Sequence, residues 1–198
     1  MTIHSLRPRI AYQSAVSTLA PAGARGVLQR WTKGKPLVVT DIYVPYRLYR
    51  IVIEDRGRQS SRYWAVDATA GTLDPYEFAC PPPQEDFVEI ETRNFLPAGL
   101  VQSEAATLAI GKIRRLIFST GFFRLVRPVI TAELVQPEFF VPYWVAFYGN
   151  EQNMTLTVLN AVRLTIEGGK VRQLIRTWLQ DGSANSLMAQ SATPRVPS

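Results

Sequence analysis

Apolar positions follow a strand period in two parts of the chain and a helix period in the part between them. Residues Tyr46–Ile53 are rich in β-branched and aromatic side chains, a composition typical of strands. From Met154 to Ile166 every second residue is apolar except Asn160, which predicts a long strand with one buried face. Within 103–120 the apolar spacing of three, four and seven predicts an amphipathic helix, whose stripe is Ala106, Ile110, Ile113, Leu116 and Ile117.

A repeated tripeptide links the two strand regions. Val44-Pro45-Tyr46 and Val141-Pro142-Tyr143 each follow a β-branched, aromatic stretch and each precede an apolar strand. A glycine follows the tyrosine by 25 positions in both copies, at Gly71 and at Gly168. Proline cannot donate to a strand ladder, so each copy is expected to mark a bulge or the junction of two strands. The repeat predicts a duplicated supersecondary unit.

Turn and linker residues divide these elements. Asp55–Arg58 and Gly168–Lys170 predict hairpin turns, so return strands are expected at Tyr63–Asp67 and Val171–Leu179. Because it joins two strands in this interpretation, Gly168–Lys170 is not expected to open a helix. Further expected elements are a short strand in 72–78, a charged edge strand at 87–91, and short helices around 10–19 and 25–31.

The predicted fold class is α+β, with two related units that each combine a helix with an antiparallel meander. Two arrangements stay open: the units lie side by side, or they form one continuous sheet with the 103–120 helix packed on it. The expected organisation is a basic N-terminal arm (1–35), a first meander unit (36–78), a Pro-rich and acidic linker (79–102), a second α-β-meander unit (103–180) and a flexible tail (181–198).

The distribution of charge is more informative than its total. The net charge of +6 divides into +8 for residues 1–62, −7 for 63–111 and +5 for 112–198. A basic–acidic–basic layout suits an acidic protein, a nucleic acid or an anionic membrane surface. It also suits two solvated basic faces separated by an acidic loop.

Chemistry-bearing residues are sparse. The single histidine, His4, lies near the N-terminus, and the single cysteine, Cys80, lies beside three prolines with no histidine nearby. Histidine-based triads and the usual zinc and iron–sulfur sites are therefore not expected. The acidic cluster lacks the glycine-punctuated spacing of a calcium loop, and its members are Glu85, Asp86, Glu89 and Glu91. We expect no catalytic residues, no metal and no cofactor; an enzyme built on carboxylates, Tyr or Lys is the alternative.

Two further patterns have local explanations. Asp67 and Asp74 flank a turn, and turn-stabilising hydrogen bonds explain them better than a pair of catalytic carboxylates. The run Tyr46–Arg50 alternates aromatic and basic residues, as in sheets that stack bases. Its two tyrosines fall on opposite faces of a strand, however, which favours a half-buried sheet over a nucleic-acid platform.

The run from Tyr63 to Leu73, YWAVDATAGTL, resembles the closing hairpin of PepSY-type domains. In that family a helix precedes an antiparallel meander, and the motif is a tyrosine, then Val-Asp-Ala, then a glycine turn and an apolar residue. The second unit has Val162-Arg163-Leu164 in place of the Asp-Ala step. The resemblance implies an inhibitory, regulatory or ligand-binding module, usually extracytoplasmic, with an apolar cleft between the units.

The function expected from these features is non-catalytic: a peripheral subunit that stabilises a larger assembly or docks an acidic carrier. By analogy, this assembly is a membrane electron-transfer complex such as a photosynthetic reaction centre. Residues 1–9 lack the apolar segment of a secretory signal, so we expect a cytoplasmic protein, peripheral to a membrane complex. A PepSY-like module and a nucleic-acid-binding protein are the alternatives. The expected partner-binding residues are Arg7, Arg9, Arg25, Arg30, Lys33, Lys35, Lys112, Arg114 and Arg115.

Overall fold

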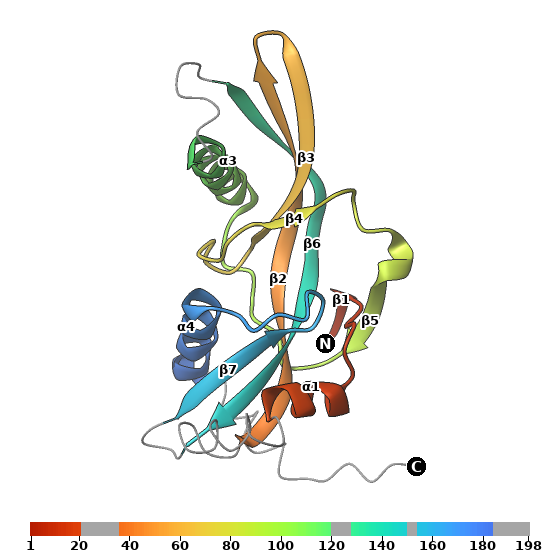
Figure 1. Ribbon diagram of the computed structural model, residues 1–198, viewed down its shortest axis with the longest axis vertical. Helices are drawn as coiled ribbons and strands as arrows, with labels where there is room; N and C mark the ends of the chain where they lie inside the picture. Colours follow the sequence, from red (N-terminus) through yellow and green to blue (C-terminus); the bar gives the residue numbers. More distant parts are fainter. Residues whose placement is uncertain (21–35, 120–127, 150–153, 184–198) are drawn as a thin grey trace. The chain divides into compact units, whose positions relative to one another are not determined.

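The computed structural model describes residues 1–20, 36–119, 128–149 and 154–183 (Figure 1). In chain order the elements are β1 (Thr2–Leu6), α1 (Tyr12–Leu19), β2 (Pro36–Asp55), β3 (Arg58–Asp67), β4 (Tyr76–Phe78), the 3-10 helix η1 (Gln84–Asp86), β5 (Phe87–Glu91), α3 (Gln102–Ser119), β6 (Val129–Tyr148), β7 (Thr155–Asn160), α4 (Gly169–Trp178) and the π-helical turn η2 (Leu179–Ser183).

The seven strands belong to one sheet, so the predicted α+β class is confirmed. Their order is β4-β3-β2-β6-β1-β5, and β7 pairs with β6 outside this path. The β2–β3, β3–β4, β1–β5 and β6–β7 pairs are antiparallel, whereas β1 and β6 are parallel. The predicted strand at 87–91 does lie at an edge of the sheet, where its charged side chains discourage further pairing.

The chain divides into two compact units made from interleaved segments. Unit 1 comprises Met1–Leu6 and Val44–Phe140, and unit 2 comprises Arg7–Tyr43 and Val141–Ser198. The sequence interpretation instead placed its units one after the other. Both long strands, β2 and β6, pass from one unit into the other, and each does so at a Val-Pro-Tyr tripeptide. The repeated tripeptide therefore marks two of the three points where the chain changes units, the third being between Leu6 and Arg7.

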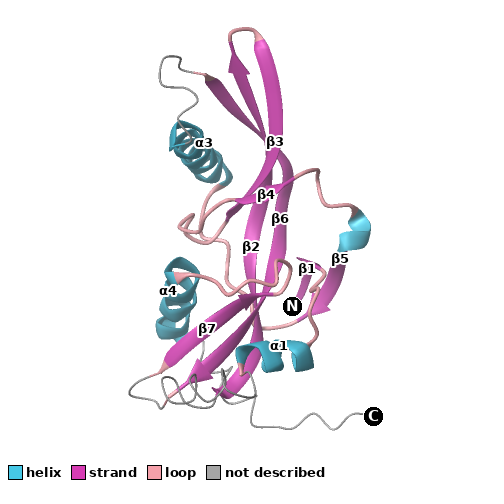
Figure 2. Cartoon of the chain, viewed as in Figure 1, coloured by secondary structure: helices cyan, strands magenta, loops and turns pink. Residues whose placement is uncertain are grey.

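In unit 1, a long β2–β3 hairpin carries helix α3 on one face. Arg56 and Gly57 both have positive φ, +50° and +75°, so the two-residue turn twists with its strands. Helix α3 lies alongside the hairpin (Figure 2), and the hairpin residues that share a core with the helix are apolar. The buried core formed by the hairpin, α3 and the start of β6 consists of Tyr49, Ile51, Ile53, Val66, Ala105, Ala109, Ile113 and Ile130.

The buried stripe of α3 agrees in part with the predicted one. Ile113 is buried, and the predicted Ala106 and Ile110 are partly buried against the same core. Leu116 has 41% of its surface exposed, whereas Ala105 and Ala109, which were not predicted, are fully buried. Their small side chains let the helix approach the hairpin closely.

In unit 2, helix α1 packs against the end of β6 and against β7. Ala15 and Leu19 of α1 form a buried cluster with Tyr148 and Leu159. The Tyr148 hydroxyl donates a hydrogen bond of 2.6 Å to the carbonyl of Leu19. The indole of Trp144 donates one of 3.1 Å to the carbonyl of Ile10. These bonds fix the N-terminal helix to the hairpin.

The second half of unit 2 corrects the sequence prediction. β7 ends at Asn160, and the predicted return strand at 171–179 is wrong because these residues form α4. Gly168 is the N-cap of α4 and not part of a hairpin turn. The buried side chains of α4 are Val171, Ile175 and Trp178, at helical spacings of four and three.

Other differences lie near the chain ends. The N-terminal arm contains strand β1, which was not predicted, and the helix expected around 10–19 is α1. The helix expected at 25–31 lies outside the described residues, as does the tail from 184 onward.

Candidate docking site

The carboxylate of Asp67 organises the turn after β3. Asp67 is fully buried. Its Oδ1 accepts hydrogen bonds from the hydroxyl of Thr69 (2.7 Å) and the amides of Ala70 (3.1 Å) and Gly71 (2.8 Å). Its Oδ2 accepts one from the amide of Leu73 (2.8 Å). The interpretation of Asp67 as a turn residue is therefore confirmed.

Asn160 has a comparable role after β7. Its Oδ1 accepts hydrogen bonds from the amides of Val162 (3.0 Å) and Arg163 (2.9 Å), and its Nδ2 donates to Glu167 Oε1 (2.9 Å). The backbone of Asn160 also donates to the carbonyl of Thr165 and accepts from the amide of Leu164, both at 2.9 Å. The segment between β7 and α4 is thus held by one side chain and its backbone.

This segment presents apolar side chains to solvent. Leu164 and Ile166 have 52% and 54% of their surface exposed. Leu164 also has a φ of +61°, a conformation that is unfavourable for a residue with a bulky side chain. An exposed leucine in a conformation better suited to glycine is not explained by packing.

Basic side chains flank this apolar pair in the sequence. Arg163 precedes Leu164, and exposed cations follow on α4 at Lys170, Arg172 and Arg176. The first turn of α4 has no acidic residue, and Gly168 provides no side-chain cap. We call these residues together the β7–α4 surface, which comprises Arg163, Leu164, Ile166, Lys170, Arg172 and Arg176.

The two units carry very different charge. The sequence of unit 2 holds eleven Lys and Arg against four Asp and Glu, a net charge of +7. Unit 1 holds eleven against twelve, a net charge of −1. Unit 2 draws on both basic ends of the sequence, and the amide of Arg9 donates a 2.8 Å hydrogen bond to the carbonyl of Ala161. Folding therefore brings an N-terminal arginine beside the β7–α4 segment.

The described members of the predicted partner-binding set occur in both units. Arg7 and Arg9 are exposed in unit 2, whereas Arg114 and Arg115 are exposed on α3 in unit 1. Lys112 is half-buried, and its Nζ donates a hydrogen bond to the carbonyl of Leu73. The remaining four lie outside the described residues: Arg25, Arg30, Lys33 and Lys35.

The residues of the β7–α4 surface were missed because the sequence interpretation placed them in two strands. Alternation from Met154 was extended past Asn160 into a segment that is not a strand. The spacing of Val171, Ile175 and Trp178 was the available signal for a helix with a basic outer face.

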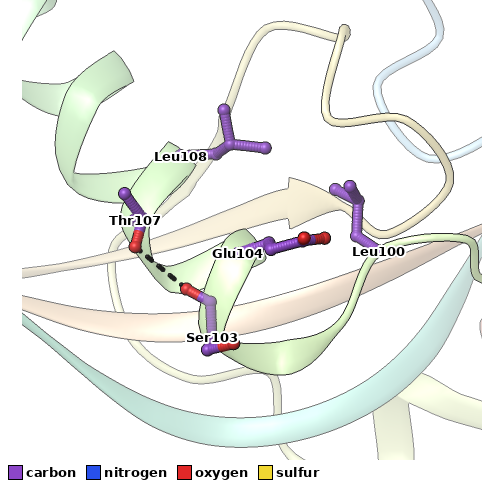
Figure 3. A pocket seen from close by; sticks show the side chains of 5 residues that line it. All are labelled: Leu100, Ser103, Glu104, Thr107 and Leu108. Atoms are coloured by element: carbon purple, nitrogen blue, oxygen red, sulfur yellow. Dashed lines mark hydrogen bonds between the residues drawn. The ribbon is translucent and has the colours of Figure 1, made fainter.

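A second feature is a pair of open hollows beside the first turns of α3, in unit 1. One, of about 440 Å³, is lined by Leu100, Ser103, Glu104, Thr107 and Leu108 (Figure 3). The other, of about 420 Å³, is lined by Tyr49, Val101, Gln102, Ser103, Ala106, Ala132 and Leu134. Their titratable side chains are one carboxylate, on Glu104, and one phenol, on Tyr49. Burial raises the pKa of Tyr49 while Arg47 acts in the opposite direction, so the phenol is neutral at physiological pH.

A buried phenol also lies in unit 2. The Tyr43 hydroxyl donates a 3.0 Å hydrogen bond to Asp41 Oδ2. Burial raises the pKa of Tyr43, and the charge of Asp41 and this hydrogen bond raise it further. Tyr43 therefore stays neutral over the physiological range and serves packing.

The remaining candidates of the sequence occupy structural positions. His4 stacks on Phe87, with 4.5 Å between ring centroids, and its Nδ1 lies 2.8 Å from Glu89 Oε1. Cys80 is exposed. In the part of the chain that the structure describes, no group of three His, Cys, Asp or Glu could hold a metal ion. Among the described helices, none is long and apolar enough to cross a membrane.

Comparisons of the chain with protein-family models, with curated proteins and with solved structures found no match. A functional assignment must therefore rest on the residues and geometry above.

Proposed function

We propose that this protein is a non-catalytic peripheral subunit of a larger assembly at a membrane surface, and that unit 2 is its docking module. The observation that carries the proposal is the segregation of charge, which by sequence is +7 for unit 2 against −1 for unit 1 and among the described residues is +3 against −3. A positive charge concentrated in one part of a chain steers association with an anionic surface. The electron-transfer complex expected from the sequence is one assembly of this kind.

Comparison of the two hairpins shows that Leu164 occupies an unusual position, and this supports a docking role for unit 2. We propose that the β2–β3 and β6–β7 hairpins are copies of one unit, in which Asp67 corresponds to Asn160. In the first copy Tyr46 pairs with Asp67 and the amide of Ala68 donates to Pro45. In the second, Tyr143 pairs with Asn160 and the amide of Ala161 donates to Pro142.

In this alignment the residue four positions after the Asp or Asn has positive φ in both copies. It is Gly71 in the first (+64°) and Leu164 in the second (+61°). A side chain at Gly71 would meet Leu108 Cδ1 at 2.7 Å, so glycine suits that crowded site. Leucine in the second copy costs about 1 kcal/mol or more in backbone conformation and is exposed. A binding role for its side chain explains why the costlier residue is present.

Purification of the tagged full-length chain from its native source in mild detergent tests this proposal. The wild-type protein should migrate with a defined set of partner proteins in stoichiometric amounts. The double variant Arg172→Glu/Arg176→Glu should lose them. Arg58→Glu/Arg93→Glu is the matched control, because it makes the same charge change at exposed positions of unit 1.

Two outcomes would contradict the proposal. One is a free 22.2 kDa monomer in the wild-type extract. The other is equal loss of the partners in both double variants, which would show a general charge effect. A nucleic acid is an alternative anionic partner for a unit whose sequence carries a net charge of +7. Recovery of nucleic acid in place of proteins, with affinity that falls steeply with salt, would establish that function instead.

A further inference from the structure

We infer that the β7–α4 surface binds the headgroup layer of an anionic lipid membrane, with Leu164 and Ile166 entering its apolar boundary. This inference rests on the proposed function in taking unit 2 as the side that meets the assembly. It goes further in naming lipid as what this surface contacts. Both side chains are more than half exposed, and both are aliphatic.

The apolar pair is presented on a rigid segment. Asn160 binds the segment through its side chain and its backbone. Ile166 forms a β-bridge with Leu159, and the amide of Glu167 donates to the carbonyl of Val158 at 2.8 Å. A surface that is ordered before it binds loses little conformational freedom on binding. Two aliphatic side chains are therefore enough to contribute measurably to the free energy of membrane binding.

The cations flank the apolar pair along the chain, where they can bind lipid phosphates. Arg163 adjoins Leu164, while Lys170 and Arg172 lie in the first turn of α4 and Arg176 one turn later. Cations near the amino end of a helix are disfavoured by its dipole, and phosphates beside them would relieve this. The apolar face of α4 is buried in unit 2 through Val171, Ile175 and Trp178, so the segment before the helix provides the apolar contact.

The composition of the surface favours lipid over an acidic protein. Protein interfaces concentrate binding energy in Trp, Tyr and Arg, and leucine is under-represented among such residues. Membrane-surface segments combine aliphatic side chains with flanking Lys and Arg. The β7–α4 surface has no Trp or Tyr, and its apolar residues are a leucine and an isoleucine flanked in sequence by four cations, so it matches the second composition.

Sedimentation with vesicles tests the inference on the full-length protein. Vesicles of phosphatidylcholine with about 30% phosphatidylglycerol should bind the protein, and vesicles of phosphatidylcholine alone should bind it much more weakly. Binding should fall between about 0.1 M and about 0.5 M salt. Each cation near the surface contributes about fivefold, so Arg172→Glu/Arg176→Glu should weaken binding by at least about 25-fold.

The apolar contribution has its own variant. Leu164→Asn/Ile166→Thr should weaken vesicle binding by about tenfold. Asparagine tolerates positive φ, and threonine suits the bridge at position 166, so this variant should fold. Val129→Thr/Val135→Thr removes two exposed aliphatic side chains of unit 1 and should bind as the wild type does.

The outcomes separate the two proposals. Wild-type binding by Leu164→Asn/Ile166→Thr, or equal binding to both vesicle types, would overturn the lipid assignment. Absence of vesicle binding, with partner proteins still lost in Arg172→Glu/Arg176→Glu, would also overturn it. That result would leave the proposed function standing, with an acidic protein on this surface. Vesicle binding by a chain that migrates without partners would support the lipid contact and refute the subunit function.

Discussion

Exchanging the two turn-organising residues, Asp67 and Asn160, tests how each turn is held. In Asp67→Asn, Oδ1 can keep the three hydrogen bonds that it accepts. An NH2 group then replaces Oδ2 and faces the amide of Leu73, which now bonds to Oδ2 at 2.8 Å. Because Leu73 is only 2% exposed, water cannot replace the lost acceptor.

A buried donor without an acceptor costs about 1–3 kcal/mol, so Asp67→Asn should destabilise unit 1 by about 2 kcal/mol. Asp67→Ala removes all four bonds and should destabilise it by at least about 4 kcal/mol. The reverse exchange, Asn160→Asp, places a carboxylate where Nδ2 lies 2.9 Å from Glu167 Oε1. This repulsion should destabilise unit 2 by about 2 kcal/mol at neutral pH.

Amide hydrogen exchange reports on each unit separately. In Asp67→Asn the Leu73 amide should exchange about 30-fold faster, the equivalent of about 2 kcal/mol, while the Arg163 amide should be unaffected. In Asn160→Asp the Arg163 amide should exchange faster. Stability of Asp67→Asn within about 0.5 kcal/mol of the wild type would refute the argument that four specific bonds to the carboxylate hold this turn.

Three further predictions concern packing and titration. In urea unfolding, Gly71→Ala should lower the free energy of unfolding by about 2 kcal/mol and Gly57→Ala by about 1 kcal/mol. Both glycines have positive φ, but of the two only Gly71 has neighbours within 4 Å of an added Cβ. Equal losses of stability would show that crowding at Gly71 is negligible. Ile113→Ala should cost about 3 kcal/mol and Leu116→Ala under about 0.5, and a reversed order would contradict the observed helix face. Burial raises the pKa of Tyr43 above 10.0, so its contribution to stability should be complete below pH 10 and fall as the pH rises further; the late part of the tyrosinate absorbance titration, to which Tyr49 also contributes, should lose one phenol in Tyr43→Phe, and an unchanged late part would contradict this assignment.

The elements that the sequence predicts well are those whose signal is local. The β2–β3 hairpin follows from β-branched alternation around an Arg-Gly turn. Helix α3 follows from apolar periodicity. Strand β1 was missed because it is short and half polar, and its pairing with residues 87–91 spans more than eighty positions. Such a strand is stabilised by a partner that a local pattern does not identify.

The candidate docking site was harder to predict for two physical reasons. Residues 161–166 continue the apolar alternation of β7 although the strand ends at Asn160, and the left-handed conformation of Leu164 in this segment is unusual for leucine. The N-terminal arginines were predicted as contact residues, but the hydrogen bond from Arg9 to Ala161 is a tertiary contact across most of the chain. The distribution of charge along the sequence therefore indicated that a basic surface exists, but it did not show which residues fold together to form that surface.

The passage of the chain between its units at the two Val-Pro-Tyr tripeptides has a consequence for biosynthesis. Every segment of unit 1 has been synthesised once residue 140 is added. Residues 7–43 are made early, yet they complete their unit only when residues 141 onward follow. The apolar residues of α1, Ala15 and Leu19, must wait during that interval for β6 and β7 to cover them. A chain released after residue 140 would hold every segment of unit 1 and would leave the apolar residues of α1 uncovered, which is the kind of surface that chaperones bind.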